Sequence, residues 1–168
     1  MLRRFIPIAV VAASMLAAPA VSDSRLRHVR PPASPQAPRY SHAVVVDGGP
    51  LIFVSGQVAY DAQRRLVGKG DMRAQTRQVF ENLKAVLEDA GSDLAHVVRL
   101  NTYLTDMSQL EAHRAVRNEY LDAGNPPAST LVGVARLVDP DLLLEVEAVA
   151  VPAGPKPPGS PAAAPPTP

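Results

Sequence analysis

The alternation of apolar and polar positions predicts both strands and helices in the middle of the chain. Two β-branched, apolar runs at 42–46 and 51–58 are separated by the sequence Asp-Gly-Gly-Pro, which favours a hairpin. The segment 97–104 alternates between apolar and polar residues, as a half-buried strand does. We expect two further strands, near 129–136 and 142–151.

Two other segments carry apolar residues at helical spacing. Asp71 is a suitable cap for a helix that ends at Ala90, just before a glycine. Ser108 and Glu111 have the spacing of a capping box, which predicts a second helix to about Leu121. The expected inward positions are Met72, Val79, Leu83, Val86, Leu87 and Ala90 in the first helix and Leu110, Val116 and Tyr120 in the second. In chain order, the elements predict an α+β fold in which two helices pack on one face of a mixed β-sheet.

The distribution of proline divides the 168 residues into a domain and its flanks. Only four of the 18 prolines lie between residues 39 and 151, so this stretch is the expected folded domain. Residues 21–38 are rich in proline and arginine and are expected to form a disordered or extended leader. Residues 152–168 are rich in proline and alanine, which is typical of a disordered, solvated tail.

The first 20 residues have the features of a secretory signal peptide. Arg3 and Arg4 precede an uncharged stretch of 14 residues, and Ala-Pro-Ala at 18–20 supplies the small residues of a cleavage site. A membrane anchor is the alternative, but about 20 apolar residues are needed to span a bilayer. We therefore expect cleavage after residue 20, no stable membrane span afterwards, and a periplasmic or secreted protein.

Composition excludes several kinds of chemistry. The chain has no cysteine, so disulfides, thiolate metal sites and cysteine nucleophiles are ruled out. It has no tryptophan, and residues 39–151 carry 11 Lys and Arg against 15 Asp and Glu, a net charge of −4 that disfavours nucleic acid as a partner. His42, His96 and His113 have no partner at metal-ligand spacing, so we expect structural or surface histidines and no metal site.

Two places within the domain carry candidate chemistry. Glu145 and Glu147 are two residues apart on a strand, so their carboxylates point to the same face. One interpretation pairs them with Arg99 or Arg136, and the other places one of them in a cleft as a proton carrier or a holder of water. Ser55-Gly56-Gln57 ends the second strand, where the glycine either admits a ligand or makes a bend.

Five ordered blocks carry these features: Tyr40-Ser41-His42-Ala43-Val44, Leu51 to Val58, Ala74 to Leu83, Val97 to Asp106, and Pro127-Ala128-Ser129-Thr130 with Glu145-Val146-Glu147-Ala148. Together they resemble the RidA/YjgF family, also labelled endoribonuclease L-PSP. The resemblance implies a chorismate-mutase-like fold that assembles as a homotrimer, with clefts for small molecules between subunits and no cofactor or metal. For the best-known branch it implies hydrolysis of enamines and imines, such as 2-aminoacrylate, to 2-keto acids and ammonia.

Carried over by position, the resemblance also implies a catalytic carboxylate and a pocket. Glu145 corresponds to the carboxylate that positions the water, together with the backbone carbonyl of Leu131. Tyr40, Ser55 and Gly56 correspond to the residues that shape the pocket.

The sequence departs from the family pattern at Ser129, which stands where an Arg binds the substrate carboxylate. Losing such a contact typically costs ~2–5 kcal/mol, so 2-aminoacrylate is expected to fit poorly unless Arg99, Arg117 or Arg136 reaches the cleft. Two functions are compatible with these residues: a divergent imine or enamine hydrolase, and a non-catalytic trimer that binds a small molecule or a client protein. Ribonuclease activity is implied only by the older family label, and the net charge disfavours it.

Overall fold

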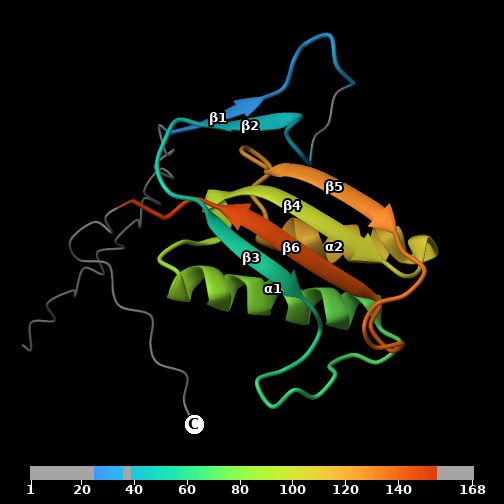
Figure 1. Ribbon diagram of the computed structural model, residues 1–168. Helices are drawn as coiled ribbons and strands as arrows, with labels where there is room; N and C mark the ends of the chain where they lie inside the picture. Colours follow the sequence, from blue (N-terminus) through green and yellow to red (C-terminus); the bar gives the residue numbers. More distant parts are fainter. Residues whose placement is uncertain (1–24, 36–38, 155–168) are drawn as a thin grey trace, which may run out of the picture.

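The computed structural model describes residues 25–35 and 39–154. A four-stranded sheet forms the centre of the fold (Figure 1). Its strands, in order across the sheet, are β3 (Ile52–Gln57), β6 (Leu144–Ala150), β4 (Val97–Leu104) and β5 (Ala128–Gly133). β6 is antiparallel to both β3 and β4, whereas β5 runs parallel to β4 at the sheet edge. The predicted signal peptide and the tail from residue 155 lie outside the described residues.

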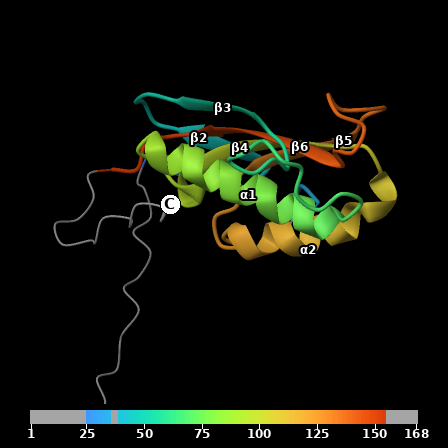
Figure 2. The ribbon, with the colours of Figure 1, turned by 90° about the horizontal axis from the view of Figure 1, so that it is seen from below.

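Two helices cover one face of this sheet, as the pattern of apolar residues predicts. α1 (Met72–Asp89) and α2 (Leu110–Tyr120) lie side by side beneath the strands (Figure 2). Short 3-10 turns, η1 (Leu94–His96) and η2 (Met107–Gln109), lead into β4 and α2. The predicted α+β class and the placement of both helices on one sheet face are therefore confirmed.

The apolar stripe of α1 supplies much of the core. Asp71 begins the helix as predicted, because its side chain accepts hydrogen bonds from the backbone N–H groups of Arg73 and Ala74. The predicted positions Val86 and Ala90 are exposed, since they lie on the solvent side of the stripe. The buried side chains of α1 are Met72, Gln75, Thr76, Val79, Phe80, Leu83 and Leu87.

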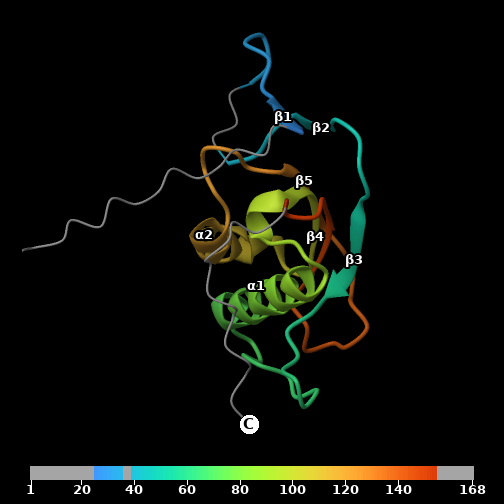
Figure 3. The same ribbon diagram turned by 90° about the vertical axis from the view of Figure 1, so that its left-hand side faces the viewer.

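The predicted hairpin between 42–46 and 51–58 is wrong. β2 (Ala43–Val46) instead pairs with β1 (Leu26–Val29), and these strands form a separate small sheet (Figure 3). β3 turns away because it pairs with β6, whose alternate residues are buried in the main core. Strand β1 thus lies within the stretch 21–38, which was expected to be a disordered or extended leader.

The start of α2 also differs from the prediction. Ser108 and Glu111 form no capping box; the carboxylate of Asp106 accepts from the backbone N–H of Ser108 at 2.9 Å and so caps the preceding turn. Glu111 pairs instead with Arg114 at 2.7 Å. Asp106 lies two residues before Ser108, the predicted cap. The segment that Asp106 caps begins with the 3-10 turn η2, and α2 follows from Leu110.

Candidate functional site

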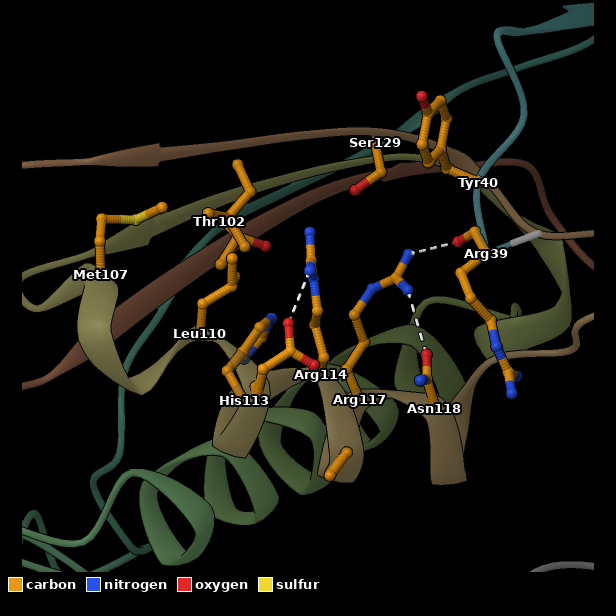
Figure 4. Close-up of a pocket in the computed structure, with 13 residues that line it drawn as sticks. Arg39, Tyr40, Thr102, Met107, Leu110, His113, Arg114, Arg117, Asn118 and Ser129 are labelled. Atoms are coloured by element: carbon orange, nitrogen blue, oxygen red, sulfur yellow. Dashed lines mark hydrogen bonds and ion pairs between the residues drawn. The ribbon is translucent and has the colours of Figure 1, made fainter. Parts of the chain in front are cut away.

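A cavity of about 710 Å³ lies between α2 and the β4–β5 edge of the sheet (Figure 4). Thr102 and Leu131 line it from the sheet, and Arg114 and Arg117 extend toward Ser129 from the helix. Such a volume is within the range of small-molecule sites in proteins.

Strand register explains why Ser129 and Leu131 face this cavity. Ser129 pairs with the buried Leu100, and Leu131 pairs with the buried Thr102. Residues paired across neighbouring strands point to the same face, so both side chains lie on the helix side of the sheet. Tyr40 joins them because the next residue, Ser41, forms a parallel bridge with Ala128 at the start of β5.

Arg117 is the most buried cation of the cavity, with 8% of its surface exposed. It donates hydrogen bonds to the backbone carbonyl of Arg39 at 3.1 Å and weakly to Asn118 Oδ1 at 3.4 Å. Within the described residues it has no carboxylate partner, whereas Arg114 pairs with Glu111. Burial, and then the neighbouring guanidinium of Arg114, lower the pKa of Arg117. A buried, unneutralised guanidinium is an environment suited to an anion.

His113 lies one helical turn before Arg117 and is fully buried. Its Nδ1 lies 3.4 Å from Thr76 Oγ1, and that hydroxyl already donates to the Met72 carbonyl at 2.7 Å. His113 Nδ1 is therefore the donor toward Thr76, and its Nε2 has no hydrogen-bond partner. Burial, followed by Arg117 and Arg114, lowers the pKa of His113 to about 4, so the ring is neutral at neutral pH.

The other predicted site residues lie on the opposite face of the sheet, near the β3 edge. Gly56 sits in a β-bulge between Val54 and Gln57, and a Cβ at this position would clash with the carboxylate of Glu145. The glycine therefore permits the close approach of a side chain, and Ser55 is exposed beside it.

Glu145 and Glu147 share a face, as predicted, but their surroundings differ. Glu147 accepts hydrogen bonds from Asn101 Nδ2 at 2.5 Å and from the Tyr103 hydroxyl at 3.1 Å, and the latter bond raises the pKa of Tyr103. Glu145 makes no hydrogen bond or ion pair with any residue in the described ranges. The suggested pairing of these carboxylates with Arg99 or Arg136 is not observed. Arg99 Nε donates instead to Asn101 Oδ1 at 3.2 Å, and β6 does not form a hairpin with β5, which precedes Arg136.

One chain does not bring all the predicted site residues together. Ser129 and Leu131, with Tyr40 nearby, line the cavity at the β5 edge, whereas Glu145 and Gly56 lie near the β3 edge. The role of α2 in the cavity was missed, apart from Arg117 as one of several candidate replacements. A signal for it exists, since Leu110, His113 and Arg117 have helical spacing on an inward stripe.

The remaining histidines have structural partners. His42 Nε2 lies 3.0 Å from the Pro35 carbonyl, and His96 Nδ1 lies 2.7 Å from Asp93. Among residues 25–35 and 39–154, no three His, Cys, Asp or Glu side chains cluster in a way that could hold a metal ion. No helix in this part of the chain has the length and apolar character needed to cross a membrane.

Sheet, helices and cavity define an α+β protein with a small-molecule-sized, partly cationic site at the edge of its sheet. Residues 32–152 match the family described as Endoribonuclease L-PSP, and the chain belongs to this family, as its resemblance to RidA/YjgF proteins indicated. A RutC family protein of Pyrococcus abyssi is 41% identical over 111 residues, which are 66% of this chain and 84% of that protein. The protein DfrA of Myxococcus xanthus is 41% identical over 122 residues, or 70% and 92% of the two chains.

Solved structures support the same assignment. The Rid family protein YyfB from Yersinia pestis is 39% identical, with a TM-score of 0.70 over 76% of this chain and 98% of its own. RidA from an Antarctic Psychrobacter species is 33% identical, with a TM-score of 0.57 over 74% and 98% of the two chains. The fold assigned from the sequence is therefore confirmed.

Proposed function

We propose that this protein is a divergent RidA-family hydrolase that acts on a small imine or enamine. The observation that carries the proposal is the state of Glu145, whose carboxylate lies against Gly56 with no protein partner in the described residues. A carboxylate without a protein partner can hold a water molecule and accept its proton.

The proposed reaction is R₂C=NH + H₂O → R₂C=O + NH₃. Glu145 accepts a proton from water as the water oxygen bonds to the imine carbon, and it returns that proton to nitrogen. The hydroxyl proton of the resulting carbinolamine then passes through Glu145 to nitrogen, so that the carbon–nitrogen bond breaks as the carbonyl forms and ammonia leaves. An enamine substrate enters this reaction after it tautomerises to the imine.

A homotrimer would bring the two halves of the site together. The two halves lie near opposite edges of one sheet, Glu145 near β3 and Ser129 on β5, so the β3 edge of one copy can meet the β5 edge of the next. On the open face of the sheet, 75% of Phe53 and 42% of Val132 are exposed. Apolar side chains displayed in this way favour a covering partner, and a closed ring of copies covers the same face in each subunit.

The activity test compares two neighbouring carboxylates. Ammonia release from freshly generated 2-iminopropionate is measured for the protein, for Glu145→Gln and for Glu147→Gln. Glu145→Gln is expected to reduce kcat by about 100-fold or more because a general base is lost. Glu147→Gln should reduce it far less, because Gln can still accept from Asn101 and Tyr103.

Binding without turnover is the competing function, and the same experiment separates it. If no variant or natural protein releases ammonia above the uncatalysed rate, the hydrolase proposal is wrong and a binding protein is the better description. Equal losses in the two Gln variants would instead contradict the special role of Glu145.

Assembly and location are further parts of the proposal. Light scattering on the protein from residue 21 onward should give the mass of three chains, and a monomer at micromolar concentration would contradict the shared cleft. We also propose export to the periplasm or the medium, based on residues 1–20. Cell fractionation that finds the uncleaved protein in the cytoplasm would contradict that part.

A further inference from the structure

We propose that the cavity binds a small monocarboxylate and that Arg117 is its anchor, in place of the Arg absent at position 129. This inference rests on the proposed function, because it names how the same site holds its ligand. It assigns a ligand-binding role to a residue of α2, whereas Ser129 and Leu131 line the same cavity from β5.

The first argument is the state of Arg117. The residue as a whole is 8% exposed, and the described partners of its guanidinium are one backbone carbonyl and one weak amide contact. A guanidinium has five N–H donors in a planar fork, so several remain available. Burying a cation without a counter-charge is costly, and a carboxylate ligand would supply both the charge and a matching two-pronged acceptor.

The second argument is position. Figure 4 shows the guanidinium of Arg117 extending from α2 toward the strand that carries Ser129, across the space that both residues line. The long side chain of Arg117 thus extends from α2 toward the wall of the cavity that carries the short side chain of Ser129. The Ser129 hydroxyl can donate one further hydrogen bond to a bound oxygen.

The third argument is the charge of the cavity. Arg114 is neutralised by Glu111 at 2.7 Å, and the buried His113 is neutral at neutral pH. The side chain of Arg39 is directed away from Ser129 in Figure 4. Arg117 therefore supplies the one uncompensated positive charge on the side of the cavity that faces Ser129, which suits a monocarboxylate at this position better than a phosphate dianion.

The test measures binding separately from turnover. Isothermal titration with pyruvate is carried out on the Glu145→Gln protein, in which the proposed catalytic carboxylate is absent. Arg117→Gln in this background should weaken pyruvate binding by about 30-fold or more. Gln can still donate to the Arg39 carbonyl, and a thermal melt checks that the variant remains folded. Exchange of the exposed Arg136 for Gln is the matched control and should change binding less than threefold.

A reciprocal exchange tests the idea of a displaced anchor. Ser129→Arg added to Arg117→Gln should restore about 10-fold or more of the lost affinity, because it returns a guanidinium to the same cavity from the opposite wall. The inference is overturned if pyruvate does not bind, if folded Arg117→Gln protein binds it as well as its parent does, or if phosphate binds more tightly than pyruvate. Pyruvate binding without any ammonia release by the natural protein would refute the hydrolase proposal while leaving the carboxylate site supported.

Discussion

The two helices pack on the same face of the sheet, but they differ in whether their buried polar side chains have hydrogen-bond partners. In α1, the buried Gln75 is fully used: its amide nitrogen donates to the carbonyls of Gly68 and Asp141, and its oxygen accepts from the Leu143 N–H. In α2, the buried His113 and Arg117 have polar atoms for which the described residues provide no matching partner.

This difference distinguishes a structural helix from a ligand-facing one. A buried polar group with all its hydrogen bonds made contributes to one specific fold, whereas one left unpaired costs roughly 1–3 kcal/mol. Gln75 ties α1 to the loops before the helix and before β6, and so contributes to the frame of the domain. The unpaired groups of α2 lie beside a cavity, where a bound ligand could satisfy them.

The largest expected effect on stability comes from a core residue of α1, the structural helix of this comparison. Leu83→Ala in α1 should lower the free energy of unfolding by about 2–5 kcal/mol, because Leu83 is fully buried and its loss leaves a cavity. Urea denaturation monitored by circular dichroism measures the change. Val86→Ala, three residues on and 40% exposed, is the control and should cost much less. Similar losses in both variants would contradict the described orientation of α1.

The second effect concerns His113 and depends on pH. Its pKa is lowered from 6.5 to about 4 in the folded protein, so between these values the unfolded chain binds a proton that the folded chain does not. Stability should therefore fall as pH decreases through this window, by up to about 3 kcal/mol, and level off below it.

Urea denaturation across this pH range, for the natural protein and for His113→Leu, isolates the contribution of the histidine. The variant should lose this part of the pH dependence and keep the part due to the carboxylates. Identical pH profiles for the two proteins would show that His113 is not buried in its neutral form.

Local patterns predicted the elements better than their pairing. The bounds of β4 and the cap of α1 were correct because both depend on neighbouring residues: strict alternation at 97–104 and a carboxylate at Asp71. The partner of β2 was not predictable from the turn at 47–50, since its pairing with Leu26–Val29 depends on contacts across the fold. The position of β6 between β3 and β4 likewise depends on contacts between residues far apart in the sequence.

The candidate site was predictable in parts. The face shared by Glu145 and Glu147 follows from strand periodicity, and the need for glycine at Gly56 follows from the resemblance and is explained by its contact with Glu145. That α2 forms the cationic wall of the cavity was not predicted from the sequence, because an arginine in a helix is usually exposed to solvent. Only packing of α2 against the β4–β5 edge turns that side chain inward.

The smallest expected effect tests how each helix begins. Asp71→Ala removes the side chain that accepts from two backbone N–H groups at the start of α1, and it should lower the free energy of unfolding by about 1 kcal/mol. Glu111→Ala should change it little, because Glu111 does not cap α2 and its pair with Arg114 is largely exposed. Urea denaturation of both variants at neutral pH measures the difference. A loss in Glu111→Ala equal to that in Asp71→Ala would mean that Glu111 caps the start of α2 together with Ser108 after all.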